Sequence, residues 1–174
     1  MKKYITLIFI LLISCANKLI AQDVKDDSLA ATYLEINGSL HQYDYAYSQL
    51  LLMLNKKYPK TEENIQGWQF LNDNKDRAIV EMKSLLVPIY SSHFTVKDLE
   101  QMIDFYQTDT AKQLMLDRSK MSDMQKQELN SYYNTAVGRK IVEKQQLLAA
   151  EIAIASENWS RDLYETAVSL LKSE

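Results

Sequence analysis

The chain has 174 residues, the length of one ordinary domain, and its formal net charge is −3. This mild acidity, without a dense stripe of lysine and arginine, makes nucleic acids and anionic lipid surfaces poor candidates as partners. The only cysteine, Cys15, lies near the N-terminus. The rest of the chain therefore cannot form a disulfide, a cysteine-ligated metal site or a thiolate nucleophile.

The N-terminus has the pattern of an export signal. Two lysines follow the first methionine, and Tyr4–Ile13 is an apolar run too short to cross a bilayer as a helix. The first interpretation is a signal peptide over residues 1–21 and a short acidic tether over 22–28. It predicts a periplasmic protein with no transmembrane span after cleavage.

The second interpretation concerns Cys15. Leu12-Ile13-Ser14-Cys15 fits a lipoprotein box, in which the cysteine becomes a lipidated N-terminus. Stable anchoring takes two or more acyl chains, and the protein would then be a membrane-anchored lipoprotein. The two interpretations predict different locations, free in the periplasm or attached to a membrane.

Residues 29–172 have the apolar periodicity of a single all-α domain. The chain has only three glycines and two prolines and no alternating β-branched runs, so strands are not expected. We predict a helical bundle of about five to seven helices. A short helix over 29–36 should end at Asn37–Gly38, and Ser39 should cap the next helix.

Two longer helices are predicted further along the chain. Apolar residues from Trp68 to Ile89 mark one helix, which Pro88 should kink or end. The pattern from Val137 to Leu171 marks a long C-terminal helix, for which a break near Ser156 is an alternative. Such a helix would be about 50 Å long at about 1.5 Å per residue.

The stretch between these two helices carries strong helix-start signals. Thr95 and Asp98 have the spacing of a capping box, and Phe94 and Leu99 have that of the hydrophobic staple beside it. Thr108 marks the next helix start. The two helices should therefore meet in a tight corner.

The same signals return 27 residues later. The pairs at this offset are Thr95 and Ser122, Phe105 and Tyr132, Tyr106 and Tyr133, Thr108 and Thr135, and Ala111 and Gly138. The small residues of the last pair stand where two helix axes must pass closely. We predict two similar helix–corner–helix units packed together, with chance similarity between capped helices as the alternative.

The first of these units also carries a family signature. Its residues are Pro88, Ile89, Tyr90, His93, Phe94, Thr95, Asp98, Leu99, Phe105, Tyr106, Thr108, Ala111 and Lys112. They resemble the signature of the domain of unknown function 2059 family, helical domains found mostly in exported bacterial proteins. Members typically show Phe-Thr-x-x-Glu-Leu and then Phe-Tyr-x-Ser-Pro-x-Gly-Lys.

This chain departs from the family pattern at four positions. Asp98, Thr108, Asp109 and Ala111 stand where members typically have Glu, Ser, Pro and Gly. The resemblance covers roughly residues 65–165, and the part before it looks like related Bacteroidetes proteins. It implies no activity, catalytic residue or ligand.

Eleven tyrosines are the most unusual feature of the composition, and Tyr43, Tyr45 and Tyr47 form one cluster. Tyrosine packs its ring in a core and forms hydrogen bonds at the rim, which is one interpretation. It is also enriched at protein interfaces, which makes these three residues a candidate interaction surface. Tyr45 distinguishes the two because it lies off the helix face of the others and should be exposed.

No catalytic, metal-binding or cofactor-binding residue is predicted. His41 and His93 have no second histidine at helical spacing, and no Gly-rich phosphate loop or nucleophile elbow occurs. The carboxylates lie mostly on polar helix faces beside lysine and glutamine, which is typical of solvated surfaces.

The sequence therefore favours a non-enzymatic module of the cell envelope that binds an unknown protein partner through its helical surface. A periplasmic carrier of a lipid or small hydrophobic ligand is the second hypothesis, and an enzyme is the third. A deep cavity lined by methionine and tyrosine would favour the carrier, and an exposed apolar patch the interaction module. Two acids converging with His93 in a cleft would favour the enzyme.

Overall fold

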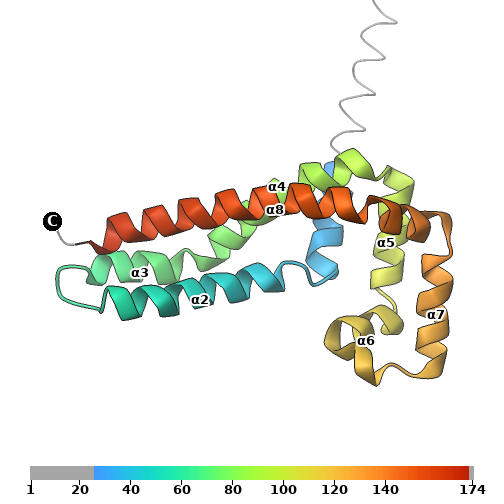
Figure 1. The fold of residues 1–174 in the computed structure, drawn as a ribbon, viewed down its shortest axis with the longest axis horizontal. Helices are drawn as coiled ribbons and strands as arrows, with labels where there is room; N and C mark the ends of the chain where they lie inside the picture. Colours follow the sequence, from blue (N-terminus) through green and yellow to red (C-terminus); the bar gives the residue numbers. More distant parts are fainter. Residues whose placement is uncertain (1–25, 173–174) are drawn as a thin grey trace, which may run out of the picture.

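The computed structural model describes residues 26–172, and all the regular structure in them is helical (Figure 1). A helical segment over residues 26–36 comes first. The elements after it are α2 (His41–Lys57), α3 (Ile65–Asp73), α4 (Lys75–His93), α5 (Val96–Tyr106), α6 (Asp109–Asp117), the 3₁₀ turn η1 (Arg118–Lys120), α7 (Asp123–Tyr133) and α8 (Ala136–Leu171). The predicted all-α fold and long C-terminal helix are confirmed.

The predicted signal peptide, Cys15 and the first part of the tether lie outside the described residues. Residues 26–28, which the sequence suggested were tether, are already helical. None of the helices in residues 26–172 combines the length and the apolar character that a membrane span requires.

The helices form an elongated bundle with a lobe at one end. Helix α8 runs along the bundle and packs against α4 and α3, while α2 packs against α4. Figure 1 shows α5, α6 and α7 together at the end of the bundle far from the C-terminus. We call these three helices and η1 the lobe.

The predicted helix from Trp68 to Ile89 is wrong as one element, because the chain breaks at Asn74 into α3 and α4. The Asn74 side-chain amide donates to the Phe70 carbonyl at 2.9 Å, and the Tyr47 hydroxyl donates to the Leu71 carbonyl at 2.7 Å. Asparagine competes with regular helical hydrogen bonds in this way. The break raises the number of α-helices in residues 26–172 to eight, above the expected range.

Three other predictions concern where helices start, end or break. Pro88 does not end its helix, since α4 continues beyond it. Ser39 does not cap α2: the N-cap is Leu40, and Ser39 instead donates through its hydroxyl and its backbone N–H to Asn37 Oδ1 at 2.6 and 2.9 Å. Helix α8 is continuous through Ser156, so the alternative of a break there is wrong.

The two predicted capping boxes are confirmed. Thr95 and Asp98 bond reciprocally at the start of α5, and Ser122 and Gln125 do the same at the start of α7. Each box satisfies backbone N–H groups that a helix start leaves without a partner.

The two corners also contain the same hydrogen bonds at equivalent positions. Thr108 caps α6 and Thr135 caps α8, and each hydroxyl donates to the carbonyl three residues before it, at 2.8 and 2.6 Å. Each hydroxyl then accepts from the amide three residues after it, Ala111 at 3.2 Å and Gly138 at 3.1 Å. The prediction of two similar helix–corner–helix units is confirmed at this level of detail.

The two units pack together through equivalent residues. The rings of Phe105 and Tyr132 stack with centroids 3.8 Å apart and planes within 5°. Phe105 also belongs to the buried core of the lobe with Ala111, Met121 and Leu129. The sequence repeat therefore becomes a symmetric contact at the centre of the lobe.

The core of the bundle follows α8 from one end to the other. One buried cluster includes the staple residues Phe94 and Leu99, a second surrounds Met82 and Trp159, and a third surrounds Trp68. The burial of both staple residues in one cluster agrees with the predicted staple.

An ion pair joins the lobe to α8. Lys140 Nζ lies 2.6 Å from Asp98 Oδ2, which also accepts from the backbone N–H and the hydroxyl of Thr95 at 3.0 and 2.8 Å. Burial raises the pKa of Asp98, but the hydrogen bonds from Lys140 and Thr95 outweigh burial and lower the pKa below its ordinary value. The carboxylate is thus stabilised in its charged form.

Candidate functional site

The three tyrosines that formed the candidate interaction surface do not share one surface. Tyr43 and Tyr47 are buried, whereas Tyr45 is 65% exposed on the opposite face of α2. The exposure predicted for Tyr45 is confirmed. Leu52 and Met53 follow it at helical spacing and are exposed as well, so the outer face of α2 has an apolar character of its own.

The two buried tyrosines use their hydroxyls inside the fold. The Tyr43 hydroxyl and Ser156 Oγ lie 2.9 Å apart, and the Tyr47 hydroxyl donates to the Leu71 carbonyl. Burial and the nearby Glu81 carboxylate raise the pKa of Tyr47. These two tyrosines are structural residues.

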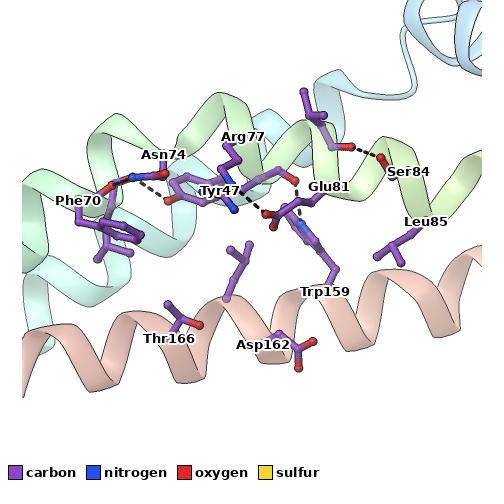
Figure 2. Close-up of a pocket in the computed structure, with 14 residues that line it drawn as sticks. Tyr47, Phe70, Asn74, Arg77, Glu81, Ser84, Leu85, Trp159, Asp162 and Thr166 are labelled. Atoms are coloured by element: carbon purple, nitrogen blue, oxygen red, sulfur yellow. Dashed lines mark hydrogen bonds and ion pairs between the residues drawn. The ribbon is translucent and has the colours of Figure 1, made fainter.

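A groove between α4 and α8 passes directly over Tyr47 (Figure 2). Its volume is about 580 Å³, a size found in small-ligand sites. Four buried side chains from four different helices form its floor, Tyr47, Leu71, Ala78 and Trp159. The groove therefore exists only when the bundle is assembled.

The polar groups of the floor already have partners within the protein. The Trp159 indole N–H donates to the Ala78 carbonyl at 3.0 Å, and the Tyr47 hydroxyl is bonded to the carbonyl of Leu71. Buried polar groups that are bonded in this way offer little to a reacting substrate. The floor is thus mainly an apolar surface.

The rim of the groove carries three exposed apolar side chains. Phe70, Val80 and Leu85 are 47%, 54% and 45% exposed. Figure 2 shows Leu85 pointing into the space between α4 and α8, at the end of the groove away from Phe70. Exposed apolar residues around an apolar floor are a feature that binding sites commonly have.

Charged residues complete the rim. On α4, Arg77 Nε lies 3.3 Å from Glu81 Oε1, and both side chains are exposed. Asp162 belongs to the lining on α8, but its carboxylate points away from α4 (Figure 2), and it has no ion pair within residues 26–172.

The break at Asn74 creates one end of the groove. Helices α3 and α4 do not follow one straight axis (Figure 1), and Phe70 and Asn74 line the groove where they separate. Sequence reasoning missed this site because it expected an unbroken helix. The signal that could have revealed the break is the pair of asparagines at positions 72 and 74, which both donate to the carbonyl four residues earlier.

The two histidines lie away from the groove. His93 Nε2 lies 3.0 Å from Glu151 Oε2, and His41 is exposed at the start of α2. Neither residue lines the groove. Among residues 26–172 no group of three or more His, Cys, Asp or Glu side chains is placed to hold a metal ion.

Residues 80–122 match the model of a family described as an uncharacterized protein conserved in bacteria (DUF2059). This is the family whose signature the sequence resembles, and the match covers most of α4, all of α5 and α6, and η1. No curated protein and no solved structure shows a significant match to the chain.

Proposed function

We propose that the protein is a non-enzymatic interaction module of the bacterial cell envelope, and that it binds an apolar segment of a partner protein in the groove between α4 and α8. The observation that carries this proposal is an apolar floor ringed by Phe70, Val80 and Leu85, which remain exposed in the isolated chain. The envelope location rests on the export pattern of the first 21 residues, which lie outside the described part.

The dimensions of the groove suit a short helical segment. Its lining on α4 runs from Asn74 to Leu85, about 17 Å, and on α8 from Trp159 to Thr166, about 11 Å, at about 1.5 Å per residue. Two to three turns of a partner helix cover this length. An amphipathic helix that lays its apolar face into a groove is a common recognition mode.

The chemistry of the groove supports binding over catalysis. The hydroxyl and indole of the floor are bonded to backbone carbonyls, and the charged side chains Arg77 and Glu81 stand on the solvated rim and pair with each other. A general acid or base needs a group aimed at the substrate inside the site. The rim charges are better placed to orient a partner than to react with it.

A carrier of a small hydrophobic ligand is the second proposal. The volume of about 580 Å³ favours it, because drug-sized ligands occupy sites of this size. The lining argues for the protein partner instead. It contains a single tyrosine and no methionine, and its apolar rim is exposed, unlike the deep methionine- and tyrosine-lined cavity expected of a carrier.

Photo-crosslinking in the native host tests the interaction proposal. A photoreactive amino acid is placed at Leu85 in the groove, at Tyr45 on the outer face of α2, or at Gln127 on the exposed surface of α7 as a control. We expect a defined protein adduct from position 85 and none from position 127. The adduct should disappear when Phe70→Asp is added, since this substitution makes the rim of the groove charged.

Three results would count against the groove. Adducts from position 45 without adducts from 85 would move the interaction to the outer face of α2. Equal adducts from positions 85 and 127 would mean non-specific capture. An adduct at 85 that survives Phe70→Asp would mean that the partner contacts Leu85 without using the apolar end of the groove at Phe70.

A further inference from the structure

Helix α8 presents a second surface, separate from the groove, that nothing else in residues 26–172 covers. Between Glu143 and Glu157 the only charged side chains of α8 are those of Lys144 and Glu151, which are both partly buried, and Glu151 pairs with His93. Leu147 and Ile154 are 46% and 63% exposed within this stretch. The carboxylate between them, Glu151, is bonded to His93, so two exposed aliphatic side chains stand without a free charge between them on a helix whose outer face elsewhere carries charges.

Three of the exposed residues of this stretch lie on one stripe. Leu147, Ala150 and Ile154 follow each other at three- and four-residue spacing, which places them on one side of the helix. Glu143 and Arg161 lie eighteen residues apart, which is about five full turns, so both side chains leave the helix on the same side, about 27 Å from each other. The stripe therefore has a negative end, an apolar middle and a positive end.

The two end charges have no ionic partner within the described chain. Neither Glu143 nor Arg161 forms an ion pair in residues 26–172, and Arg161 donates only to the side chain of Asn158, at 2.6 Å. Both residues are exposed. They are thus available to charges on another molecule.

We propose that this stripe binds the same stripe of a second copy of the chain, with the two α8 helices antiparallel about a two-fold axis near position 152. The axis lies midway between Glu143 and Arg161, so each glutamate meets the arginine of the second copy at both ends. Ala150 meets Ile154 of the second copy on both sides of the axis. Leu147 then lies beside Glu157 and Asn158 of the second copy, at the edge of the contact.

The order of charges on the stripe selects this arrangement. A parallel pair of α8 helices would place Glu143 against Glu143 and Arg161 against Arg161, and like charges repel. The antiparallel pair turns the same four charges into two attractive contacts. A self-complementary patch is also what an interface with two-fold symmetry requires.

The dimer leaves the groove open. The α8 residues that line the groove, among them Trp159, Leu163 and Thr166, lie on another side of the helix from Leu147 and Ile154. The dimer and the groove are therefore independent proposals, and either can fail without the other.

Sedimentation equilibrium of the purified protein, expressed from the full chain, tests the dimer. We expect wild-type protein to pass from monomer to dimer as its concentration rises. Ile154→Glu should raise the dissociation constant of the dimer at least about tenfold, because it places a carboxylate in the apolar middle. Met124→Glu is the matched control, an exposed apolar residue in the lobe, and should leave the dissociation constant unchanged.

Charge reversal tests the antiparallel register. Glu143→Arg and Arg161→Glu should each weaken the dimer about tenfold, since each replaces two attractive contacts by two repulsive ones. Both changes in the same chain should restore the wild-type dissociation constant to within about threefold. Circular dichroism of each variant checks that the helices remain folded.

The proposal is overturned by any of three results. Wild-type protein that stays monomeric at every concentration excludes the dimer. A dimer that is indifferent to Ile154→Glu uses another surface. A double reversal that is as weak as the single ones shows that Glu143 and Arg161 do not meet across the axis.

Discussion

Thr95 fixes the start of α5 with its side chain. Its hydroxyl donates to Asp98 Oδ2 at 2.8 Å and accepts from the Asp98 backbone N–H at 3.3 Å. Thr95→Ala should lower the free energy of unfolding by about 1 kcal/mol, because the cap is lost. Urea unfolding measures this. Thr61→Ala is the control, because Thr61 donates through its backbone N–H, which the substitution keeps. Equal stability of Thr95→Ala and wild type would mean that the cap contributes nothing.

Gly138 is required by the second corner. A Cβ at this position would lie 2.1 Å from the Tyr132 carbonyl oxygen and 2.6 Å from Tyr133 Cα, both of them backbone atoms that cannot move independently of the corner. Gly138→Ala should therefore lower the free energy of unfolding by about 1–3 kcal/mol or more. Denaturant unfolding without any loss of stability would contradict this view of the corner.

The equivalent position in the first corner provides a matched comparison. Ala111 is fully buried and carries its Cβ without conflict, so the two corners are similar in hydrogen bonding but not identical in space. Ala111→Gly should lower the free energy of unfolding by about 1 kcal/mol, the usual difference between alanine and glycine inside a helix. The effect of Gly138→Ala should exceed it.

Residue roles that depend on near neighbours could be predicted from the sequence. The caps at Thr95, Thr108 and Ser122 are of this kind, because a cap and its partner lie within three residues. The need for a glycine at position 67, by contrast, could not be predicted. A Cβ there would lie 2.4 Å from the Leu170 carbonyl oxygen, on a helix about a hundred residues away in the chain.

At the scale of elements, the break between α3 and α4 depends on Tyr47. The Leu71 carbonyl, which would accept from a backbone N–H in a continuous helix, accepts from the Tyr47 hydroxyl at 2.7 Å. Tyr47→Phe leaves this buried carbonyl without that donor and should cost about 1–2 kcal/mol in the free energy of unfolding. Urea unfolding monitored by circular dichroism measures the loss.

Tyr45→Phe is the matched control for this substitution. Tyr45 lies on the same helix, but its side chain is exposed, so removal of its hydroxyl should leave the free energy of unfolding within about 0.5 kcal/mol of wild type. If Tyr45→Phe and Tyr47→Phe had equal effects, the Tyr47 hydroxyl would not be what supports the break.

Element boundaries could be predicted where the signal is local and not where it comes from elsewhere. Gly38 adopts a positive φ of 75° and ends the first helical segment as the sequence indicates. The end of α3 depends on a tyrosine 24 residues earlier in the chain. A pattern read along one segment contains no information about such a donor, and the helix was therefore predicted as continuous.

At the scale of the whole molecule, the Asp98–Lys140 ion pair attaches the lobe to α8. The pKa of Asp98 is lowered in the folded protein, so its contribution to stability is present above the ordinary aspartate pKa of about 3.9 and is lost as the pH falls through the lower folded value. Asp98→Asn should therefore be less stable than wild type at neutral pH. The difference in the free energy of unfolding should shrink below about pH 4.

Urea unfolding of both proteins across the acid range measures this dependence. Lys97→Gln is a suitable control, because Lys97 is an exposed neighbour that takes no part in the ion pair. A difference between wild type and Asp98→Asn that stayed constant down to pH 2 would mean that the charge of Asp98 does not attach the lobe.

The groove is also a property of the whole molecule. Its floor takes one residue from each of α2, α3, α4 and α8, and two of them, Tyr47 and Trp159, are more than a hundred residues apart. The sequence indicated a helical surface for binding but placed it at the tyrosine cluster. That location could not be correct for all three residues, since Tyr43 and Tyr47 share the core face of α2.

Native mass spectrometry of the protein released from the envelope of its own host tests the central claim most directly, with wild type measured beside Leu85→Glu. We predict that wild type carries a protein partner, beyond any second copy of the chain, and that Leu85→Glu, which places a charge on the rim of the groove, has lost it. A partner that Leu85→Glu retains would contradict binding in the groove. A small molecule bound to wild type in place of a protein would establish the carrier instead.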